Sequence, residues 1–164
     1  MAAQSPSLQS VRFDPLLRCI AERREILDGE LLRQSVSLDL PLDPRRAFEC
    51  LRNLNCLVHW WPRAVSVRPL PPGIFGVGDM GILELARGSA WFRVMRYVPN
   101  RRLLLALVNR RDVLAIELRW VAQNRLDLVL EAPRRRYGLF WQSLWLRAMC
   151  IRAARALKSH LLEY

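Results

Sequence analysis

The most regular pattern in the chain is the stretch 138–164, where apolar positions recur at helical spacing. These positions form one continuous stripe, whereas Arg147, Arg152, Arg155 and Lys158 fall on the other side. The stripe comprises Leu139, Leu146, Met149, Cys150, Ala153, Leu157 and Leu161. At about 1.5 Å per residue this helix would be roughly 40 Å long, enough to cross a small domain. A long amphipathic helix of this kind needs a sheet on which to bury its stripe.

Alternation of apolar and polar positions predicts the strands of such a sheet. Residues 32–40 alternate and predict a half-buried strand, which Pro41 ends. Further strands are predicted over about 65–67, 75–86, 90–98, 103–108, 113–122 and 125–131. The turns between them are short, so neighbouring strands should pair antiparallel as a meander. Three glycines within 75–86, namely Gly76, Gly78 and Gly81, predict a bend or a bulge in that strand.

Two short helical segments follow the first strand. Asp43-Pro44 predicts an N-cap with Pro at the first helical position, and the second segment, 57–61, ends at Pro62. Strands grouped together with helices at the ends indicate an α+β fold. We therefore expect a curved seven-stranded antiparallel sheet wrapped around a long C-terminal helix.

The length of 164 residues favours one folded domain, over 31–164, preceded by an N-terminal extension, 1–30. Asp14-Pro15 could cap a helix over about 14–28 in this extension. No window has eighteen apolar residues free of charge, so a membrane-spanning helix is not expected.

The net charge of +11 comes almost entirely from Arg, since Lys158 is the one Lys in the chain. The basic residues are dispersed as pairs and one triplet, which favours a role in solubility over recognition of nucleic acid. The four Cys include no CxxC pair, which indicates structural thiols in a reducing compartment, and we expect a cytoplasmic protein. With two His and no Cys/His cluster along the sequence, neither a metal site nor a cofactor is expected.

The order of these features resembles the helix-grip superfamily (SRPBCC), which includes Bet v 1-like, START-like and polyketide cyclase-like proteins. The resemblance covers about 31–164 and is carried by five features: the first strand with LPLDPRRAFECLRN, the segment LVHWWP at 57–62, the strand GVGDMGILEL, the turn YVPNRRL at 97–103 and the terminal helix. One departure is Gln123-Asn124-Arg125, where many members carry a Gly-Thr turn, and it leaves the register of the last hairpin open.

The resemblance implies a cavity between the sheet and the long helix that binds apolar ligands. The residues expected to line it are Trp61 near the mouth, Tyr97, Ile116, Leu118, Trp120 and Leu128 on the sheet, and Leu146, Met149, Cys150 and Ala153 on the helix. The alternative is a solid core filled by the same side chains. Gly78 and Gly81 favour a void, whereas the large Trp120 and Met149 favour filling.

Some members of the superfamily catalyse cyclisation or dehydration, so ionisable residues near such a cavity are candidates for acid–base work. They are His59, Asp79, Glu84, Arg93, Tyr97 and Glu117. His59 is the catalytic candidate because its unperturbed pKa lies near neutrality. It also stands beside two Trp and could simply pack there, and no acid is spaced to orient it. A cyclase or dehydratase is therefore the alternative and not the preferred interpretation.

A last candidate surface precedes and begins the terminal helix. It combines Arg134, Arg135 and Arg136 with Phe140, Trp141 and Trp145. Aromatic and basic side chains together suit an anionic membrane interface, although a protein partner or the 14–28 helix could cover them instead. We expect the chain to bind or transport a lipid, quinone or isoprenoid, in peripheral contact with a membrane. An interaction module for protein or RNA, using the Arg pairs, is a further alternative.

Overall fold

The computed structural model describes residues 31–70, 76–109, 113–134 and 138–164. The extension 1–30 and its expected 14–28 helix lie outside the described residues. The described elements are β1 (Leu31–Asp39), α2 (Pro44–Leu51), the 3-10 turn η1 (Leu54–Cys56), α3 (Leu57–Trp60), β2 (Ala64–Leu70), β3 (Met80–Leu85), β4 (Ser89–Val98), β5 (Arg102–Val108), β6 (Val113–Ala122), β7 (Arg125–Pro133) and α4 (Leu139–Glu163).

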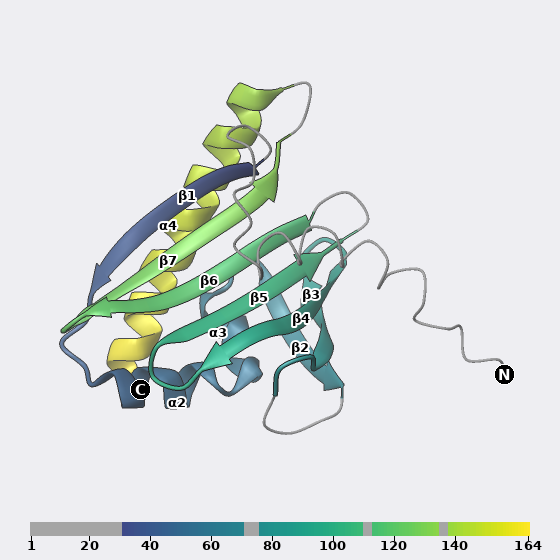
Figure 1. Ribbon diagram of the computed structural model, residues 1–164. Coiled ribbons are helices and arrows are strands. Elements are labelled where there is room, and N and C mark those ends of the chain that lie inside the picture. Colours follow the sequence, from purple (N-terminus) through teal and green to yellow (C-terminus); the bar gives the residue numbers. More distant parts are fainter. Residues whose placement is uncertain (1–30, 71–75, 110–112, 135–137) are drawn as a thin grey trace, which may run out of the picture.

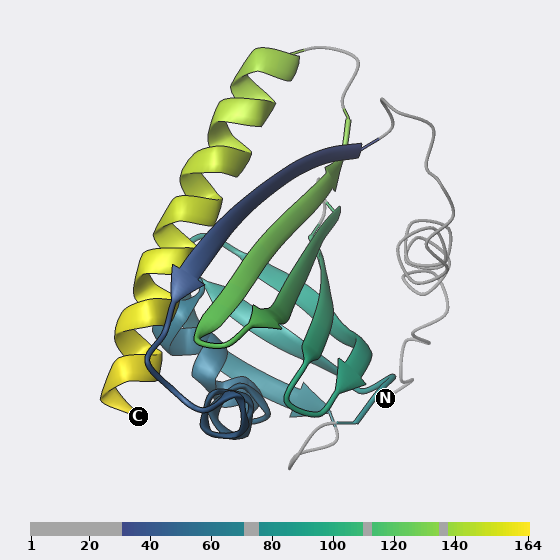
Figure 2. The same cartoon turned by 60° about the vertical axis from the view of Figure 1, so that its left-hand side comes forward.

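The seven strands form one sheet in the order β1-β7-β6-β5-β4-β3-β2, and every neighbouring pair is antiparallel. The expected α+β fold and meander are therefore confirmed, and β1 joins the sheet through β7. The sheet is strongly curved (Figure 1). α4 runs along it beside β1 and β7, and the short helices close one end (Figure 2). No helix within the described ranges is long and apolar enough to cross a membrane.

Two hairpin turns use Asn in the left-handed conformation. Asn100 follows Pro99 with φ 59°, which fits the second central position of a type II turn, and the Arg101 N–H donates to the Val98 carbonyl at 3.0 Å. Asn124 has φ 63° and lies between the paired residues Ala122 and Arg125. This pairing settles the register that the sequence left open, because it places Leu126, Leu128 and Leu130 on the buried face.

Glycine is required at position 81 of β3 because neighbouring strands approach its backbone closely, and no void remains beside it. A Cβ at this position would lie 2.2 Å from Cζ of Phe92 and 2.8 Å from the Arg68 carbonyl oxygen. The Phe92 ring, fully buried on β4, therefore occupies the space that Gly81 leaves. The expectation that this glycine indicates a cavity is corrected here, since a neighbouring aromatic side chain fills the gap.

The apolar stripe of α4 is buried against the inner face of the sheet, as its spacing predicts. Leu146, Cys150, Ala153, Leu157 and Leu161 are all at most 2% exposed. They belong to one core cluster with the inward side chains of the sheet, including Ile116, Leu118 and Leu128. The middle of α4 is thus packed against the sheet within this core cluster.

The first short helix, α2, begins with the cap that the sequence predicts. The Asp43 side chain accepts a hydrogen bond from the Arg45 N–H at 2.9 Å, and Pro44 takes the first helical position of α2. A 3-10 turn, capped by Asn53, then links α2 to α3. This turn was not predicted, and it brings Cys56 back towards Cys50 at the end of α2.

Candidate functional site

A hollow of about 190 Å³ lies between the first half of α4 and one end of the strands β3 to β6. Its lining is mostly apolar and comes from three places: the α3–β2 turn, the strand ends and α4. The lining residues are Trp61, Pro62, Arg63, Leu85, Arg87, Ala90, Leu107, Asn109, Leu114, Trp145 and Met149. Because adjacent antiparallel strands alternate in direction, the end of β3 and the start of β4 meet at this edge, as do the end of β5 and the start of β6.

The turn after α3 is pinned at the mouth of the hollow by backbone hydrogen bonds. The Ala64 N–H donates to the Trp61 carbonyl at 3.1 Å, and the Ala86 N–H donates to the Arg63 carbonyl at 2.9 Å. Arg63 has φ 65°, a conformation that costs free energy for a residue other than glycine and that recurs at ligand clamps. The turn thus buries Trp61 while it holds the exposed Arg63 at the rim.

The chemistry of the lining is apolar with a cationic rim. Arg63 and Arg87 are the ionisable residues among those that line the hollow, and both are exposed. A pocket that encloses a drug-sized ligand usually measures about 300–1,000 Å³. At about 190 Å³, this hollow holds a ring or part of a chain and leaves the rest of a larger ligand outside.

The residues expected to line a cavity divide into two groups. Trp61 and Met149 line the hollow, and so does Trp145, which was expected on the adjoining surface. The core cluster holds Ile116, Leu118, Leu128, Leu146, Cys150 and Ala153, while Tyr97 and Trp120 pack against it, half-buried. The sequence did not single out Leu85, Ala90, Leu107 and Leu114. Their positions next to predicted turns were the available signal, because turn-flanking residues of successive hairpins gather at one edge.

The ionisable candidates from the sequence lie away from the hollow. His59 is exposed, and its ring stacks on that of His160 near the other end of α4, with ring centroids 4.8 Å apart. Glu117 is buried in an ion pair with Arg102 and lies 2.9 Å from Arg119. The Asp79 carboxylate accepts a hydrogen bond from the Gly76 N–H at 2.6 Å. Glu84 is exposed, and Arg93 and Tyr97 are half-buried on β4. The lining therefore carries no acid–base pair among the described residues.

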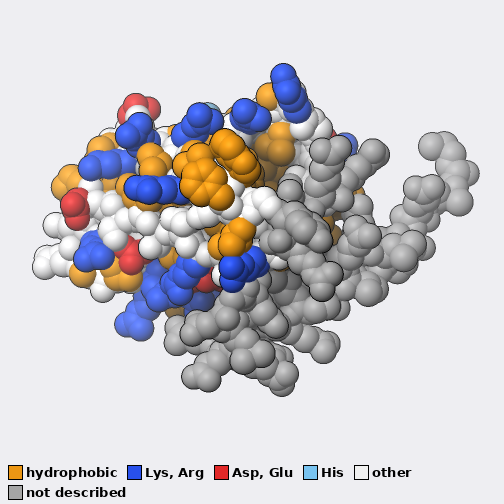
Figure 3. Space-filling model, turned by 90° about the horizontal axis from the view of Figure 1, so that it is seen from above, with side chains coloured by type: hydrophobic (Ala, Val, Ile, Leu, Met, Phe, Trp, Pro, Cys, Tyr) orange, Lys and Arg blue, Asp and Glu red, His pale blue; other side chains and the backbone are white. Residues whose placement is uncertain are grey.

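An exposed apolar patch covers the start of α4. It consists of Phe140 and Trp141, both 71% exposed, Leu144 and Trp145. Arg134 is exposed nearby along the chain, whereas Arg135 and Arg136 lie outside the described residues. Figure 3 looks onto this end of the molecule and shows apolar side chains bordered by Arg and Lys side chains. Trp145 belongs both to this patch and to the lining of the hollow, so the two are continuous.

A second group of candidate side chains was not expected from the sequence. Cys50, Cys56 and His160 come together where α2 and η1 meet the end of α4, and their ligand atoms all lie within 4.8 Å of one another. The hydrogen bond with Cys50 lowers the pKa of the Cys56 thiol to about 6, against the opposing effect of burial. The same bond and burial raise the pKa of Cys50. Away from this group, burial raises the pKa of Cys150 to about 11.

Comparison with known proteins finds similarity in structure only. No protein-family profile matches the chain, and no curated protein matches its sequence. Among solved structures, the major latex-like protein 151 of Panax ginseng superposes with a TM-score of 0.62 at 10% identity, covering 80% of this chain and 98% of that one. Protein MLL2253 of Mesorhizobium loti gives a TM-score of 0.61 at 13% identity, covering 80% and 97%.

A further similar structure is DynU16, a protein of the dynemicin biosynthetic locus. It gives a TM-score of 0.60 at 13% identity over 82% of this chain, and the chain spans 48% of the length of DynU16. These identities are low, so the similarity concerns the fold. The chain has the helix-grip fold that its sequence resembles.

Proposed function

We propose that the chain binds one amphipathic lipid or isoprenoid, with the apolar part in the hollow and an anionic head group at its rim. The observation that carries this proposal is the position of Trp145, which lines the hollow and also belongs to the exposed patch on α4. A ligand could pass from a membrane surface into the hollow along apolar side chains, without crossing water.

The apolar part of the ligand is supported by the lining. Trp61, Leu85, Leu107, Leu114 and Met149 offer aliphatic and aromatic surface, and Met adapts to irregular shapes. The small volume favours a chain end or a single ring inside, with the remainder of the ligand lying against the patch. This arrangement suits a molecule that stays partly in contact with the bilayer while bound.

The anionic head group is supported by the two cations at the rim. Arg63 and Arg87 both border the apolar lining, and a guanidinium recognises carboxylate or phosphate through two parallel hydrogen bonds. Both side chains are exposed, so each contributes modestly, about two- to fivefold in affinity. A neutral quinone carries no charge with which either guanidinium could form an ion pair.

Filling the hollow provides the test. Met149 is half-buried in the lining, whereas its neighbour Ala148 is exposed and does not line the hollow. We expect Met149→Trp to weaken binding of the fluorescent fatty acid cis-parinaric acid more than tenfold, because the larger side chain occupies the volume. The matched variant Ala148→Trp should bind as the unchanged chain does. Titration followed by probe fluorescence measures both constants.

The role of Arg63 at the rim is tested by comparing the binding of an acidic ligand with that of its neutral ester. Arg63→Asn keeps a residue that tolerates positive φ and removes the charge, so the turn should persist. Its affinity for cis-parinaric acid should fall about two- to fivefold, while its affinity for the methyl ester should not change. Full binding of the acid by Met149→Trp would contradict the proposal, and equal loss for acid and ester in Arg63→Asn would remove the anionic head group from it.

A further inference from the structure

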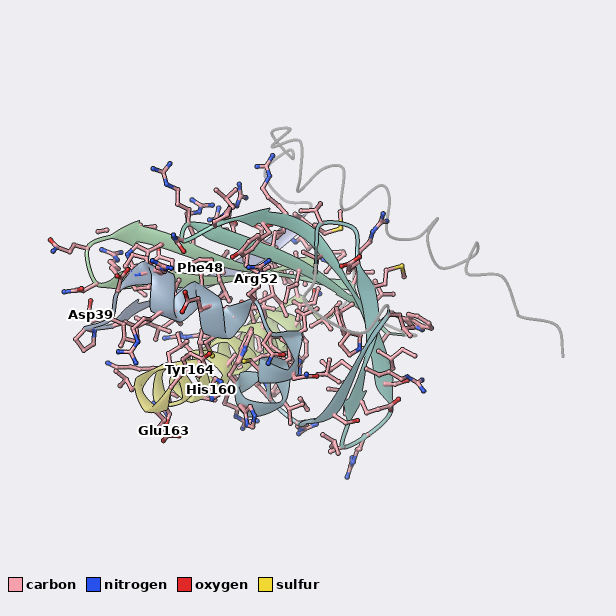
Figure 4. The ribbon with its side chains drawn as sticks, turned by 90° about the horizontal axis from the view of Figure 1, so that it is seen from below. Asp39, Phe48, Arg52, His160, Glu163 and Tyr164 are labelled. Carbon is pink, nitrogen blue, oxygen red and sulfur yellow. The ribbon has the colours of Figure 1, made fainter. Side chains whose placement is uncertain are left out.

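Three metal-ligand side chains converge at the end of the molecule far from the start of α4. Cys50 comes from the last turn of α2, Cys56 from η1 and His160 from the last turns of α4. Figure 4 shows His160 on α4 beside the short helices. Its separation from Met149 along α4 corresponds to about 16 Å at helical rise, so this cluster is distinct from the hollow.

The distances within the cluster fit a single tetrahedral ion. The Cys50 and Cys56 sulfur atoms are 3.4 Å apart, and Sγ of Cys50 lies 3.3 Å from Nε2 of His160. A zinc ion with Zn–S of about 2.3 Å and Zn–N of about 2.0 Å would place two sulfur atoms about 3.8 Å apart and sulfur about 3.5 Å from nitrogen. These two separations are slightly shorter, as expected of groups that hydrogen-bond to one another, and all three ligand atoms lie within 4.8 Å of one another.

The backbone holds the two thiols in place before any ion binds. The 3-10 turn is capped by the Asn53 side chain, which accepts from the Asn55 N–H at 3.1 Å. The Asn53 N–H donates to the Cys50 carbonyl at 3.1 Å, and the same carbonyl lies 2.9 Å from the Cys56 sulfur. Little rearrangement is therefore needed to present both sulfur atoms to one ion.

Burial and charge also favour an ion at this position. Cys50 is fully buried and Cys56 is 8% exposed, whereas His160 is half-buried and the neighbouring His59 is exposed, so the imidazole side gives access from solvent. Two thiolates balance the charge of a divalent cation, so the loaded site places no net charge in the core. Thiolate and imidazole ligands together select zinc over the hard cations magnesium and calcium.

We propose that Cys50, Cys56 and His160 form a zinc site with three protein ligands, whose fourth position is taken by a solvent molecule. A bound ion would fasten the end of α4 to α2 and η1. His59 stacks on the ring of His160 with an interplanar angle of 17° and lies outside the ligand set. It supports the orientation of the ligand ring without binding the ion.

The test is a titration of the reduced, chelator-stripped chain with Co²⁺, in a Cys19→Ser background that leaves three thiols. We expect binding of one ion per chain, with a thiolate-to-cobalt charge-transfer band and the visible bands of a tetrahedral ion, and displacement by one equivalent of Zn²⁺. Cys50→Ser, Cys56→Ser and His160→Gln should each weaken Co²⁺ binding at least tenfold. Zn²⁺ should raise the unfolding temperature of the parent chain and not that of these variants.

The chain offers two matched controls. His59→Gln replaces the neighbouring imidazole, and Cys150→Ala removes a buried thiol outside the cluster. Both should keep the charge-transfer band and bind Co²⁺ within about threefold of the parent. Because His160 is half-buried at the rim, His160→Gln should fold even where a Cys variant fails, which circular dichroism checks. Absence of the charge-transfer band in the parent, or equal losses in His160→Gln and His59→Gln, would overturn the assignment.

Discussion

Gly81 is the residue at which β3 makes room for its neighbour. The Phe92 ring of β4 occupies the space where a Cβ of residue 81 would lie, and the Arg68 carbonyl of β2 is also close to that position. We expect Gly81→Ala to lower the free energy of unfolding by about 1–3 kcal/mol, because the added methyl group overpacks a buried site. Urea denaturation measures the change.

A second substitution separates overpacking from backbone effects. Phe92→Leu in the Gly81→Ala background removes the ring atoms nearest the added methyl group. The double variant should then be more stable than the sum of the two single changes predicts. Strict additivity of the two changes would show that the ring is not the source of the strain.

The sequence predicted a bend in a strand over 75–86, whereas β3 spans Met80–Leu85 and includes Gly81 but neither Gly76 nor Gly78. The sequence could not indicate what occupies the space beside Gly81. A glycine at position 81 can be seen in the sequence, but the side chain that requires it, Phe92, lies on another strand. The Cys/His cluster was missed for the same kind of reason. Cys50 and Cys56 do not have the spacing of a known zinc motif, and His160 stands 110 residues after Cys50. Only the packing of α4 against the short helices brings it there.

At the scale of elements, α4 combines two different surfaces. From Leu146 onwards it buries a single stripe, as its periodicity predicted. Its first turns are apolar on several sides, and the resulting patch of Phe140, Trp141, Leu144 and Trp145 is exposed among the described residues. Amphipathic periodicity predicted the buried stripe well. It could not decide what meets the patch, because sequence periodicity describes one chain and not its partner.

We expect the patch on α4 to mediate binding to anionic vesicles. Phe140→Ser combined with Trp141→Ser removes two exposed aromatic side chains, and the loss of apolar contact should weaken binding more than tenfold. Co-sedimentation with vesicles of phosphatidylcholine and phosphatidylglycerol measures the partition.

The other end of α4 provides the control for this prediction. Leu162 and Tyr164 are also exposed, at 48% and 61%, but lie far from the hollow along the helix. Leu162→Ser combined with Tyr164→Ser should leave vesicle binding unchanged. Similar losses in both double variants would assign the binding to general surface apolarity and not to the patch.

At the scale of the whole molecule, turn chemistry was sufficient to predict most of the sheet. Short turns such as Pro99-Asn100 force neighbouring strands to pair, which gives the run from β2 to β7. They leave the partner of β1 open, and the structure shows that β1 joins the sheet through β7. The glycines predicted a bend, but no local pattern indicated where a hollow would form, and the hollow described here lies at the strand ends near Trp61.

The two proposed sites lie at different ends of α4 and share no lining residue. Sites that have no common partners contribute independently to stability. At a hundredfold excess over its dissociation constant, each ligand should stabilise the fold by about 2.7 kcal/mol. We therefore expect cis-parinaric acid and Zn²⁺ together to add about 5.4 kcal/mol to the free energy of unfolding, which urea denaturation with each ligand alone and with both measures.

Single substitutions show which site provides each part of this increase in the free energy of unfolding. Met149→Trp should remove the contribution of the acid alone, and His160→Gln that of zinc alone, since each substitution touches one site. A combined effect that departs from the sum by more than about 1 kcal/mol would mean that α4 transmits a change between its ends. Zinc would then act on ligand affinity as well as on stability, because coupling between two binding sites is reciprocal.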